Sequence, residues 1–422
     1  MSKTLITGAM IFDATGAAPF EGDVLIDNGK IEAVSPKPGQ IPQTECEVIE
    51  ARGRFLMPGM TDGHAHLSFE NVVGPDDLLN MPTEEHVLLT ARVAKTVLDQ
   101  GFTSMYCASE ARLRLGVAVR NEVDAGRLPG PRIRAGSQSI TVTGGMGDES
   151  RQHSHRGGIS IVIDGPEEMR KAVRLCCREG CDNIKLDVSG DPFYPAPSQS
   201  TPLSFDEIKM AVDTAHNLGR KVNAHTRSKE GTKLCLAAGV DGLLHVEYTD
   251  EEVLDLLEEA KDRVFVVPSV ALLHTMLNEA TGFGITREIA TGMGIAELLE
   301  ESIKTHTALR KRGIRHLIGG DYGLAFAPNG TNARDIKYFV DYYGYSPADA
   351  LLCATRNGGL AMRDSGDLGT IRVGSLADLL LVNGDPLKDV TILTDAERLE
   401  VIMKGGELHK NTLGSRKPGA TA

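Results

Sequence analysis

Residues 57–67 read Met57-Pro-Gly-Met-Thr-Asp-Gly-His64-Ala-His66-Leu67, and this stretch decides the fold that we predict. Its short apolar start predicts a buried strand over Leu56–Asp62. Alternate residues of a strand project to the same side, so His64 and His66, just past the strand's end, aim two imidazoles at one point. A His-x-His pair alone is weak evidence for a metal, and the rest of the chain has to supply further ligands.

After this stretch, apolar segments alternate with helical patterns such as Glu84–Asp99, which is typical of repeated strand–helix units around a parallel sheet. With Leu56–Asp62 the strands number eight, which predicts an α/β fold, a closed (β/α)₈ or TIM barrel over residues 58–364. The other predicted strands are Phe102–Ala108, Arg132–Gly136, Asn183–Val188, Lys221–Thr226, Gly242–Glu247, Val264–Ser269 and His316–Asp321.

The two ends of the chain, residues 1–57 and 365–422, are rich in short strand patterns. In the first, Asn28-Gly29 lies between two apolar runs and is a strong two-residue hairpin signal. Similar runs between glycine turns return over Gly369–Val382 and Leu399–Lys404. Because chain termini often lie close together, we expect both ends to form one small β-sandwich-like domain.

Four more residues with metal-ligand or acid–base chemistry fall on predicted barrel strands. Lys185 lies in the fourth strand, His225 ends the fifth, His245 ends the sixth and Asp321 ends the eighth. The carboxyl ends of barrel strands share one mouth, so these side chains should converge with the His-x-His pair. Four imidazoles and a carboxylate suit a divalent cation, of which zinc is the first choice and cobalt, manganese and nickel are alternatives.

Lys185 is the unexpected member, because an ammonium would repel metal ions. Either the site depresses its pKa, or its neutral amine reacts with carbon dioxide to give N6-carboxylysine, a carbamate anion able to bridge two cations. Two metals could then share a hydroxide and lower its pKa, while Asp321 takes the hydroxide's proton and passes it to the leaving group. The plainer alternatives are a buried structural lysine and an aspartate that caps the following helix.

These motifs resemble the amidohydrolase superfamily, whose members use a (β/α)₈ barrel, a bridging carboxylated lysine and a strand-eight aspartate. Gly374-Ser-Leu-Ala-Asp378-Leu and Gly384-Asp-Pro resemble the tail of its imidazolonepropionase- and prolidase-like branch, whose closing strands join the N-terminal sheet. Lysine-bearing enzymes of that branch include Xaa-Pro dipeptidases, carboxypeptidase-type dipeptidases and ochratoxinase-like amidases. The resemblance rests on Pro58–His66, Lys185, His225, His245 and Asp321.

The resemblance implies a binuclear metal-dependent hydrolase that cleaves an amide bond of a dipeptide or N-acyl amino acid by attack of a metal-bridging hydroxide, with Asp321 as general base and acid. In this arrangement two divalent cations share the carboxylated lysine. The first cation would be held by His64, His66 and Asp321, the second by His225 and His245, and both by Lys185.

Two departures from the family pattern concern the substrate. The branch usually reads Thr-Gly-Gly-His-Gly after strand three, whereas this chain has Met146 at the histidine position, in an irregular loop over residues 143–158 that we expect to be mobile. Arg227 follows the strand-five ligand and could grip a substrate's free carboxylate, or only pair with a surface acid such as Glu230. Tyr248 and Tyr322 follow ligands closely and are further candidates for substrate contacts, unless they pack at the rim.

Two other functions stay open. A mononuclear deaminase or cyclic-amide hydrolase, similar to imidazolonepropionase, would bind one metal and use Lys185 only structurally. A non-catalytic assembly protein with the same fold should lack some of the metal ligands, whereas this chain has all of the expected ones.

The composition limits the kinds of binding partner that we expect. The chain has 422 residues with 45 Lys and Arg against 58 Asp and Glu, a formal charge of −13. Without a basic cluster or an apolar run of about 20 residues, we expect no nucleic-acid and no membrane partner, only a small-molecule amide substrate. Seven cysteines without framework spacing predict reduced thiols and a cytoplasmic protein. By resemblance we also expect a homo-oligomer.

Overall fold

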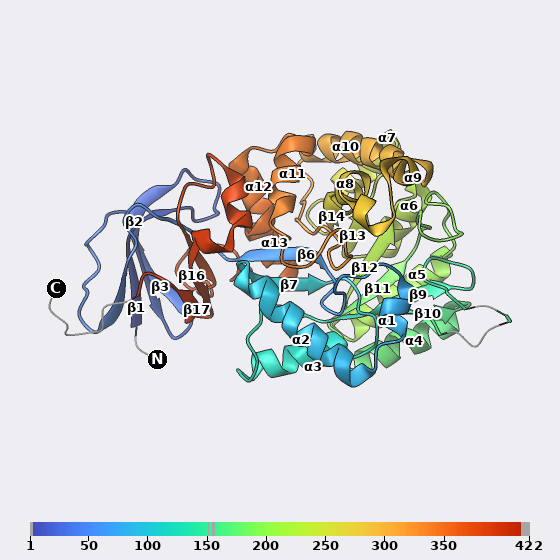
Figure 1. Ribbon diagram of the computed structural model, residues 1–422, viewed down its shortest axis with the longest axis horizontal. Helices are drawn as coiled ribbons and strands as arrows, with labels where there is room; N and C mark the ends of the chain where they lie inside the picture. The colour runs from blue at the N-terminus through green and yellow to red at the C-terminus, as the bar shows by residue number, and fades with distance from the viewer. Residues whose placement is uncertain (1–2, 151, 154–156, 415–422) are drawn as a thin grey trace.

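The computed structural model describes residues 3–150, 152–153 and 157–414, so part of the predicted loop over residues 143–158 lies outside the described residues. Figure 1 shows two parts side by side, a small sheet and a larger barrel surrounded by helices. The small sheet contains strands from both ends of the chain, and the barrel contains the strands between them, as predicted.

The larger part is a (β/α)₈ barrel of parallel strands. Its strands are β6 (Met60–Ala65), β7 (Phe102–Cys107), β8 (Arg132–Arg134), β9 (Gly136–Val142), β11 (Asn183–Asp187), β12 (Lys221–Thr226), β13 (Gly242–His245) and β14 (Phe265–Val267), with β10 (Ser160–Ile163) added beside β9. The third strand is longer than predicted. It breaks at Ala135 into β8, which pairs with β7, and β9, which pairs with β11.

The eighth strand is formed by only a few hydrogen bonds. Residues 315–318 pair with β14, since the amide of Val266 donates to the carbonyl of Arg315 and the amide of Leu317 donates to that of Val266, both at 3.0 Å. On the other side the amide of Gly63 in β6 donates to Ile318 at 2.8 Å. These bonds close the barrel, although the predicted strand His316–Asp321 is not regular along its length.

Helices cover the outside of the barrel (Figure 1). In α4, for example, the buried residues Met169, Ala172, Val173 and Cys176 repeat at helical spacing and face the strands. The helices are α1 (Pro75–Leu79), α2 (Thr83–Asp99), α3 (Leu115–Asp124), α4 (Pro166–Arg178), α5 (Phe205–Asn217), α6 (Lys229–Ala238), α7 (Glu251–Glu259), α8 (Val270–Asn278), α9 (Arg287–Gly292), α10 (Ile295–Lys311), α11 (Arg334–Tyr343), α12 (Pro347–Ala354) and α13 (Arg356–Met362), with 3₁₀ turns at Ala280–Phe283, Val390–Thr394 and Ala396–Arg398.

The small part is an eight-stranded sheet that rolls around its own core. Asn28 and Gly29 both have positive φ and form the predicted tight hairpin. Hydrogen bonds between Ile31 and residues 374–375 bring the far edge of the sheet back onto the C-terminal segment. The strands are β1 (Lys3–Ile11), β2 (Phe20–Asp27), β3 (Lys30–Ser35), β4 (Cys46–Glu50), β5 (Phe55–Pro58), β15 (Leu379–Val382), β16 (Leu399–Lys404) and β17 (Glu407–Asn411).

The predicted strand Leu56–Asp62 is two strands, because the chain passes from one part to the other at Gly59. A Cβ at this position would lie 2.1 Å from Thr103 Oγ1, so only glycine fits here. Alternate residues of β5 and β15 face two cores. Those in the small core are Leu56, Leu379 and Leu381, and those in the barrel core are Phe55, Met57, Leu380 and Val382.

In the described part of the chain, no helix is both long and apolar enough to cross a bilayer.

Candidate metal centre and active site

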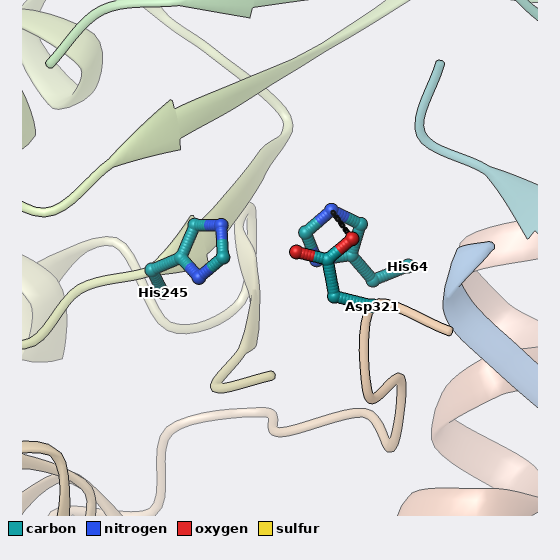
Figure 2. Close-up of side chains that lie close together, drawn as sticks. All are labelled: His64, His245 and Asp321. Atoms are coloured by element: carbon teal, nitrogen blue, oxygen red, sulfur yellow. Dashed lines mark ion pairs between the residues drawn. The ribbon is translucent and has the colours of Figure 1, made fainter. Parts of the chain in front are cut away.

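Three predicted ligands meet at the carboxyl ends of the barrel strands. The side chains of His64, His245 and Asp321 offer ligand atoms that all lie within 4.8 Å of one another. Figure 2 shows the Asp321 carboxylate beside the His64 imidazole, with the His245 ring approaching from another strand. His66 joins them, because its Nε2 lies 2.9 Å from Asp321 Oδ1, while His64 Nε2 is 3.7 Å from the same oxygen.

The short contact between His66 and Asp321 requires a positive charge, either a proton or a metal ion, between or beside the two groups. His66 Nδ1 lies 2.8 Å from the carbonyl oxygen of Ser109, so this nitrogen carries the proton and donates it. In the neutral ring Nε2 then presents a lone pair to the Asp321 carboxylate, which also offers only lone pairs. Two acceptors at 2.9 Å repel each other unless a proton or a metal ion lies between them or beside them.

His225 and His245 form the second pair of imidazoles, with ring centroids 4.3 Å apart. His225 Nε2 faces the carbonyl oxygen of Gly190 at 3.2 Å, which leaves its Nδ1 as the nitrogen with a free lone pair. His245 Nδ1 is buried and has no hydrogen-bond partner. The His64 ring lies 5.2 Å from both the His66 ring and the His245 ring and therefore connects the two pairs.

Electrostatics favours neutral imidazoles facing an ionised carboxylate. Burial lowers the pKa values of His64, His225 and His245 well below the ordinary value, so these rings are neutral, the form that binds metals. Burial alone would raise the pKa of Asp321, but the neighbouring His64, His66 and Lys185 lower it well below its usual range. Asp321 is therefore an anion.

Lys185 lies on β11, is 2% exposed and lines the same cavity as the histidines. Burial lowers the pKa of its amine, against the opposing effect of Asp187 and Asp321. A lowered pKa increases the fraction of neutral amine, which is the nucleophilic form. This donor set, four imidazoles, one carboxylate and one amine with a lowered pKa, fits divalent cations of the zinc type.

Four non-glycine residues at this mouth have left-handed backbone conformations. They are His245 (φ 78°), Val246 (59°), Ser269 (58°) and Asp321 (63°). Such conformations cost about 1–3 kcal/mol each and persist where surrounding contacts impose them, often at functional sites. Here they turn the chain sharply at the strand ends so that the His245 and Asp321 side chains reach the centre.

The candidate ligands line a cavity of about 420 Å³. Asp187 and Asp191 line this cavity together with Lys185. The rest of the lining is largely apolar and comes from βα loops and neighbouring helices. The apolar lining includes Phe69, Val72, Leu78, Leu272, Leu324 and Phe326.

The four predicted substrate contacts have different surroundings. Met146 lines the cavity. Arg227 does not: it is 1% exposed, and its guanidinium binds Asp191 at 2.9 Å and Glu247 instead of the surface residue Glu230. Tyr248 donates to Glu297 at 2.9 Å, and the buried hydroxyl of Tyr322 lies 3.5 Å from Asp335. The geometry thus leaves Arg227, Tyr248 and Tyr322 outside the cavity lining, and their roles stay predictions.

Sequence reasoning missed several residues around the centre. Asp187 follows Lys185 by two positions, the same spacing that drew attention to His64 and His66, so this signal was present. The hydroxyl of Ser269 lies 2.6 Å from His64 Nδ1, and the chain order gives no sign of this contact. Asp62, in the quoted stretch, accepts from the amide of His64 at 2.8 Å, and burial raises the pKa of Asp62 to about 6.

Comparison with known proteins is consistent with this geometry. The profile of the amidohydrolase family matches residues 55–408. An ochratoxinase from Aspergillus niger is 27% identical over 437 residues, which cover 96% of this chain and 86% of the relative. An imidazolonepropionase from Symbiobacterium thermophilum is 23% identical over 393 residues, 86% of this chain and 84% of the relative. The solved structure of a Xaa-Pro dipeptidase with bound methionine in the active site has a TM-score of 0.87 and 26% identity, and covers 97% of this chain and 100% of that one.

Proposed function

The chain belongs to the amidohydrolase family, and from this premise we propose that it is a binuclear metal-dependent hydrolase of dipeptides or N-acyl amino acids. As a member of this family it is an enzyme that acts on amide carbon–nitrogen bonds. Its relatives place it in the branch that contains ochratoxinase, Xaa-Pro dipeptidase and imidazolonepropionase. To this family membership we add the proposal that the active site holds two cations and a carboxylated lysine.

In this proposal the ligands divide between two cations. His64, His66 and Asp321 would hold the first cation, His225 and His245 would hold the second, and the carboxylated Lys185 would bind both. When bound, such cations lower the pKa of water and polarise a carbonyl oxygen. Carboxylation would join the neutral amine of Lys185 to carbon dioxide and release one proton, so the side chain would change from a neutral amine to an anion.

Asp321 moves the proton. It is an anion beside His66 and lines the cavity, so it can accept a proton from the attacking water. It then donates this proton to the leaving nitrogen, which departs as a neutral amine. The apolar part of the cavity lining would exclude water from a bound substrate and strengthen electrostatic interactions inside the site.

One observation carries the proposal: His66 Nε2 and Asp321 Oδ1 face each other at 2.9 Å in a cavity that also contains Lys185, His225 and His245. A structural cluster would be expected to satisfy these groups with protein hydrogen bonds. Here His245 Nδ1 is buried without a partner, and His66 and Asp321 reach the same cavity from other strands, which is an arrangement that metal ions complete.

The proposal predicts that metal-loaded protein hydrolyses members of a panel of dipeptides and N-acyl amino acids, and that chelation abolishes the activity. The Asp321→Asn variant should lose about 10²–10⁴-fold in kcat, because the proton transfer is lost. Turnover is followed by detection of the released amine. Full turnover by Asp321→Asn would remove the proton-transfer role. Deamination of a cyclic or aromatic amine without amide hydrolysis would support the mononuclear alternative.

We also propose a cytoplasmic location and self-association. The location is supported by the seven cysteines, all of which are free thiols. Self-association is proposed from resemblance to the family, and sedimentation of the purified protein tests it.

A further inference from the structure

We propose that Asp187 binds a protonated amine of the substrate next to the scissile bond, so that the substrates are dipeptides or other aminoacyl amides and not N-acyl amino acids. This inference rests on the proposed function, because it names the substrate class of the same site. It decides between dipeptides and N-acyl amino acids, the two substrate classes that the family resemblance leaves open.

The first observation is an unsatisfied carboxylate oxygen on a residue that lines the cavity. Asp187 is 1% exposed and lines the cavity that contains the candidate ligands. Its Oδ1 is buried and has no hydrogen-bond partner. A carboxylate oxygen buried without a donor is costly, and a donor supplied by a ligand removes that cost.

The second observation is the position of Asp187 relative to the chemistry. It ends β11, two residues after Lys185, so both side chains project to the inside of the barrel. In the sheet register Asp187 also pairs with His225 on the neighbouring strand. A group bound to Asp187 would therefore lie close to the bond that the candidate metal centre attacks.

The third observation is the charge of the cavity wall. The only lysine or arginine among the lining residues described is Lys185, and carboxylation would make that side chain an anion. Arg227 is already bound to Asp191 and Glu247. A substrate carboxylate would find no free guanidinium at this end of the cavity, whereas a substrate ammonium would find the free oxygen of Asp187.

The fourth observation concerns the rest of the substrate. Much of the cavity lining is apolar, with Val72, Leu272 and Phe326 among its residues, and Met146 adds a further apolar contact. Together with Asp187, this cavity suits an amide with a free amino group near the scissile bond and apolar side chains.

The test uses two ligands that differ in one group. Alanyl-phenylalanine carries the free amine, and propionyl-phenylalanine has the same scissile amide with a hydrogen in its place. At one fixed, mildly alkaline pH, kcat/KM of the metal-loaded wild-type enzyme should be about tenfold or more higher for alanyl-phenylalanine, as expected for a hydrogen bond to a charged group. Equal values, or a preference for propionyl-phenylalanine, overturn the inference while leaving amide hydrolysis established.

The variant Asp187→Asn keeps the shape of the side chain and removes its charge. We expect the preference between the two ligands to fall to within about threefold, with the metal content unchanged. Ser160→Ala, which removes another hydrogen-bonding group from the same cavity, should retain the preference of the wild type. A preference that survives Asp187→Asn in full would assign the amine to another group and overturn the inference.

Failure of the proposed function has a different signature. If the metal-loaded wild-type enzyme cleaves neither ligand, dipeptide hydrolysis is excluded for this pair, and calorimetric titration with the same two uncleaved ligands decides the inference. Tighter binding of alanyl-phenylalanine that is lost in Asp187→Asn supports the amine site. Equal affinity for both ligands contradicts it.

Discussion

Single hydrogen bonds from outside the candidate centre orient its histidines. The hydroxyl of Ser269 lies 2.6 Å from His64 Nδ1, and the carbonyl of Ser109 lies 2.8 Å from His66 Nδ1. Each contact occupies one ring nitrogen, and in both rings the other nitrogen, Nε2, faces Asp321. Such partners fix ring orientation and usually matter nearly as much as the ligands themselves.

We predict that Ser269→Ala weakens metal binding by about 10–100-fold, because the His64 ring loses the contact that holds it. Competition with a chromogenic chelator measures the affinity. Ser302→Ala is the matched control, since Ser302 is also buried but its hydroxyl contacts Tyr343 at 2.8 Å instead of a candidate ligand. Equal metal affinity in the two variants would show that the Ser269 contact has no role in binding.

At this scale the sequence predicted much of the cluster. The His-x-His spacing and the positions of His245 and Asp321 at strand ends were enough to predict that these side chains gather, and the structure brings them together. The ligand roles themselves stay predictions. The contact with Ser269 could not be predicted, because it joins residues 205 positions apart through a backbone turn that no local pattern indicates.

Among the elements, β13 ends in a strained turn that a buried histidine supports. His245 has φ 78°, and its carbonyl accepts from His306 Nε2 at 2.7 Å. His306 Nδ1 lies 3.0 Å from His316 Nε2, and His316 Nδ1 lies 2.8 Å from the hydroxyl of Tyr345. This chain of contacts connects α10 and the eighth strand to the backbone of a candidate ligand.

The same histidines predict how stability depends on pH. Burial lowers the pKa of His306 to about 3, although its bond to His245 acts in the opposite direction. In the unfolded chain the imidazole has a pKa of about 6.5, so between these values only the unfolded state binds the proton. The contribution of neutral His306 is therefore complete above about pH 6.5 and decreases as the pH falls toward 3.

We predict that the free energy of unfolding of metal-free protein falls with decreasing pH in this window, by about 1.4 kcal/mol per pH unit for each such histidine. Urea unfolding at several pH values measures the slope. His306→Gln keeps a donor toward the His245 carbonyl and cannot titrate, so its slope should be smaller. An unchanged slope in this variant would rule out His306 as a contributor.

Periodicity predicted the barrel strands well where each strand is continuous, and less well where tertiary contacts interrupt them. The break at Gly59 depends on the side chain of Thr103, which is distant in sequence. The eighth strand pairs only over residues 315–318 because the backbone then turns toward Asp321. Neither feature is encoded in local apolar spacing.

In the whole molecule, the small sheet and the barrel are joined by more than the connection at Gly59. Arg132 of β8 donates two hydrogen bonds of 2.9 Å to the carboxylate of Asp378, which precedes β15. Asp378 is 2% exposed and also accepts from the amide of Gly405 at 2.7 Å. The ion pair therefore ties the C-terminal segment to the barrel.

We predict that Asp378→Asn lowers the free energy of unfolding by about 2 kcal/mol, because the Arg132 guanidinium loses a buried charged partner. Denaturant or thermal unfolding measures the change. Asp385→Asn is the control, since its partner Lys388 lies on the surface and such pairs contribute at most about 1 kcal/mol. A loss no larger than that of the control would show that the pair does not stabilise the junction.

The two-part organisation was predictable because both ends of the chain have strand patterns without helices. The segment between them alternates strand and helix patterns. How the small sheet rolls around its core was not, since it depends on contacts such as that of Ile31 with Ser375. The cavity wall was likewise beyond prediction, because loops from several strand ends assemble it.

The central claim is that two divalent cations share the carboxylated side chain of Lys185. Its most direct test is the metal content of the protein after loading with excess zinc and bicarbonate and removal of unbound metal, with Lys185→Ala measured alongside. Two equivalents per chain in the wild type and at most one in the variant are the predicted result. One equivalent in the wild type, or two in the variant, would contradict the account.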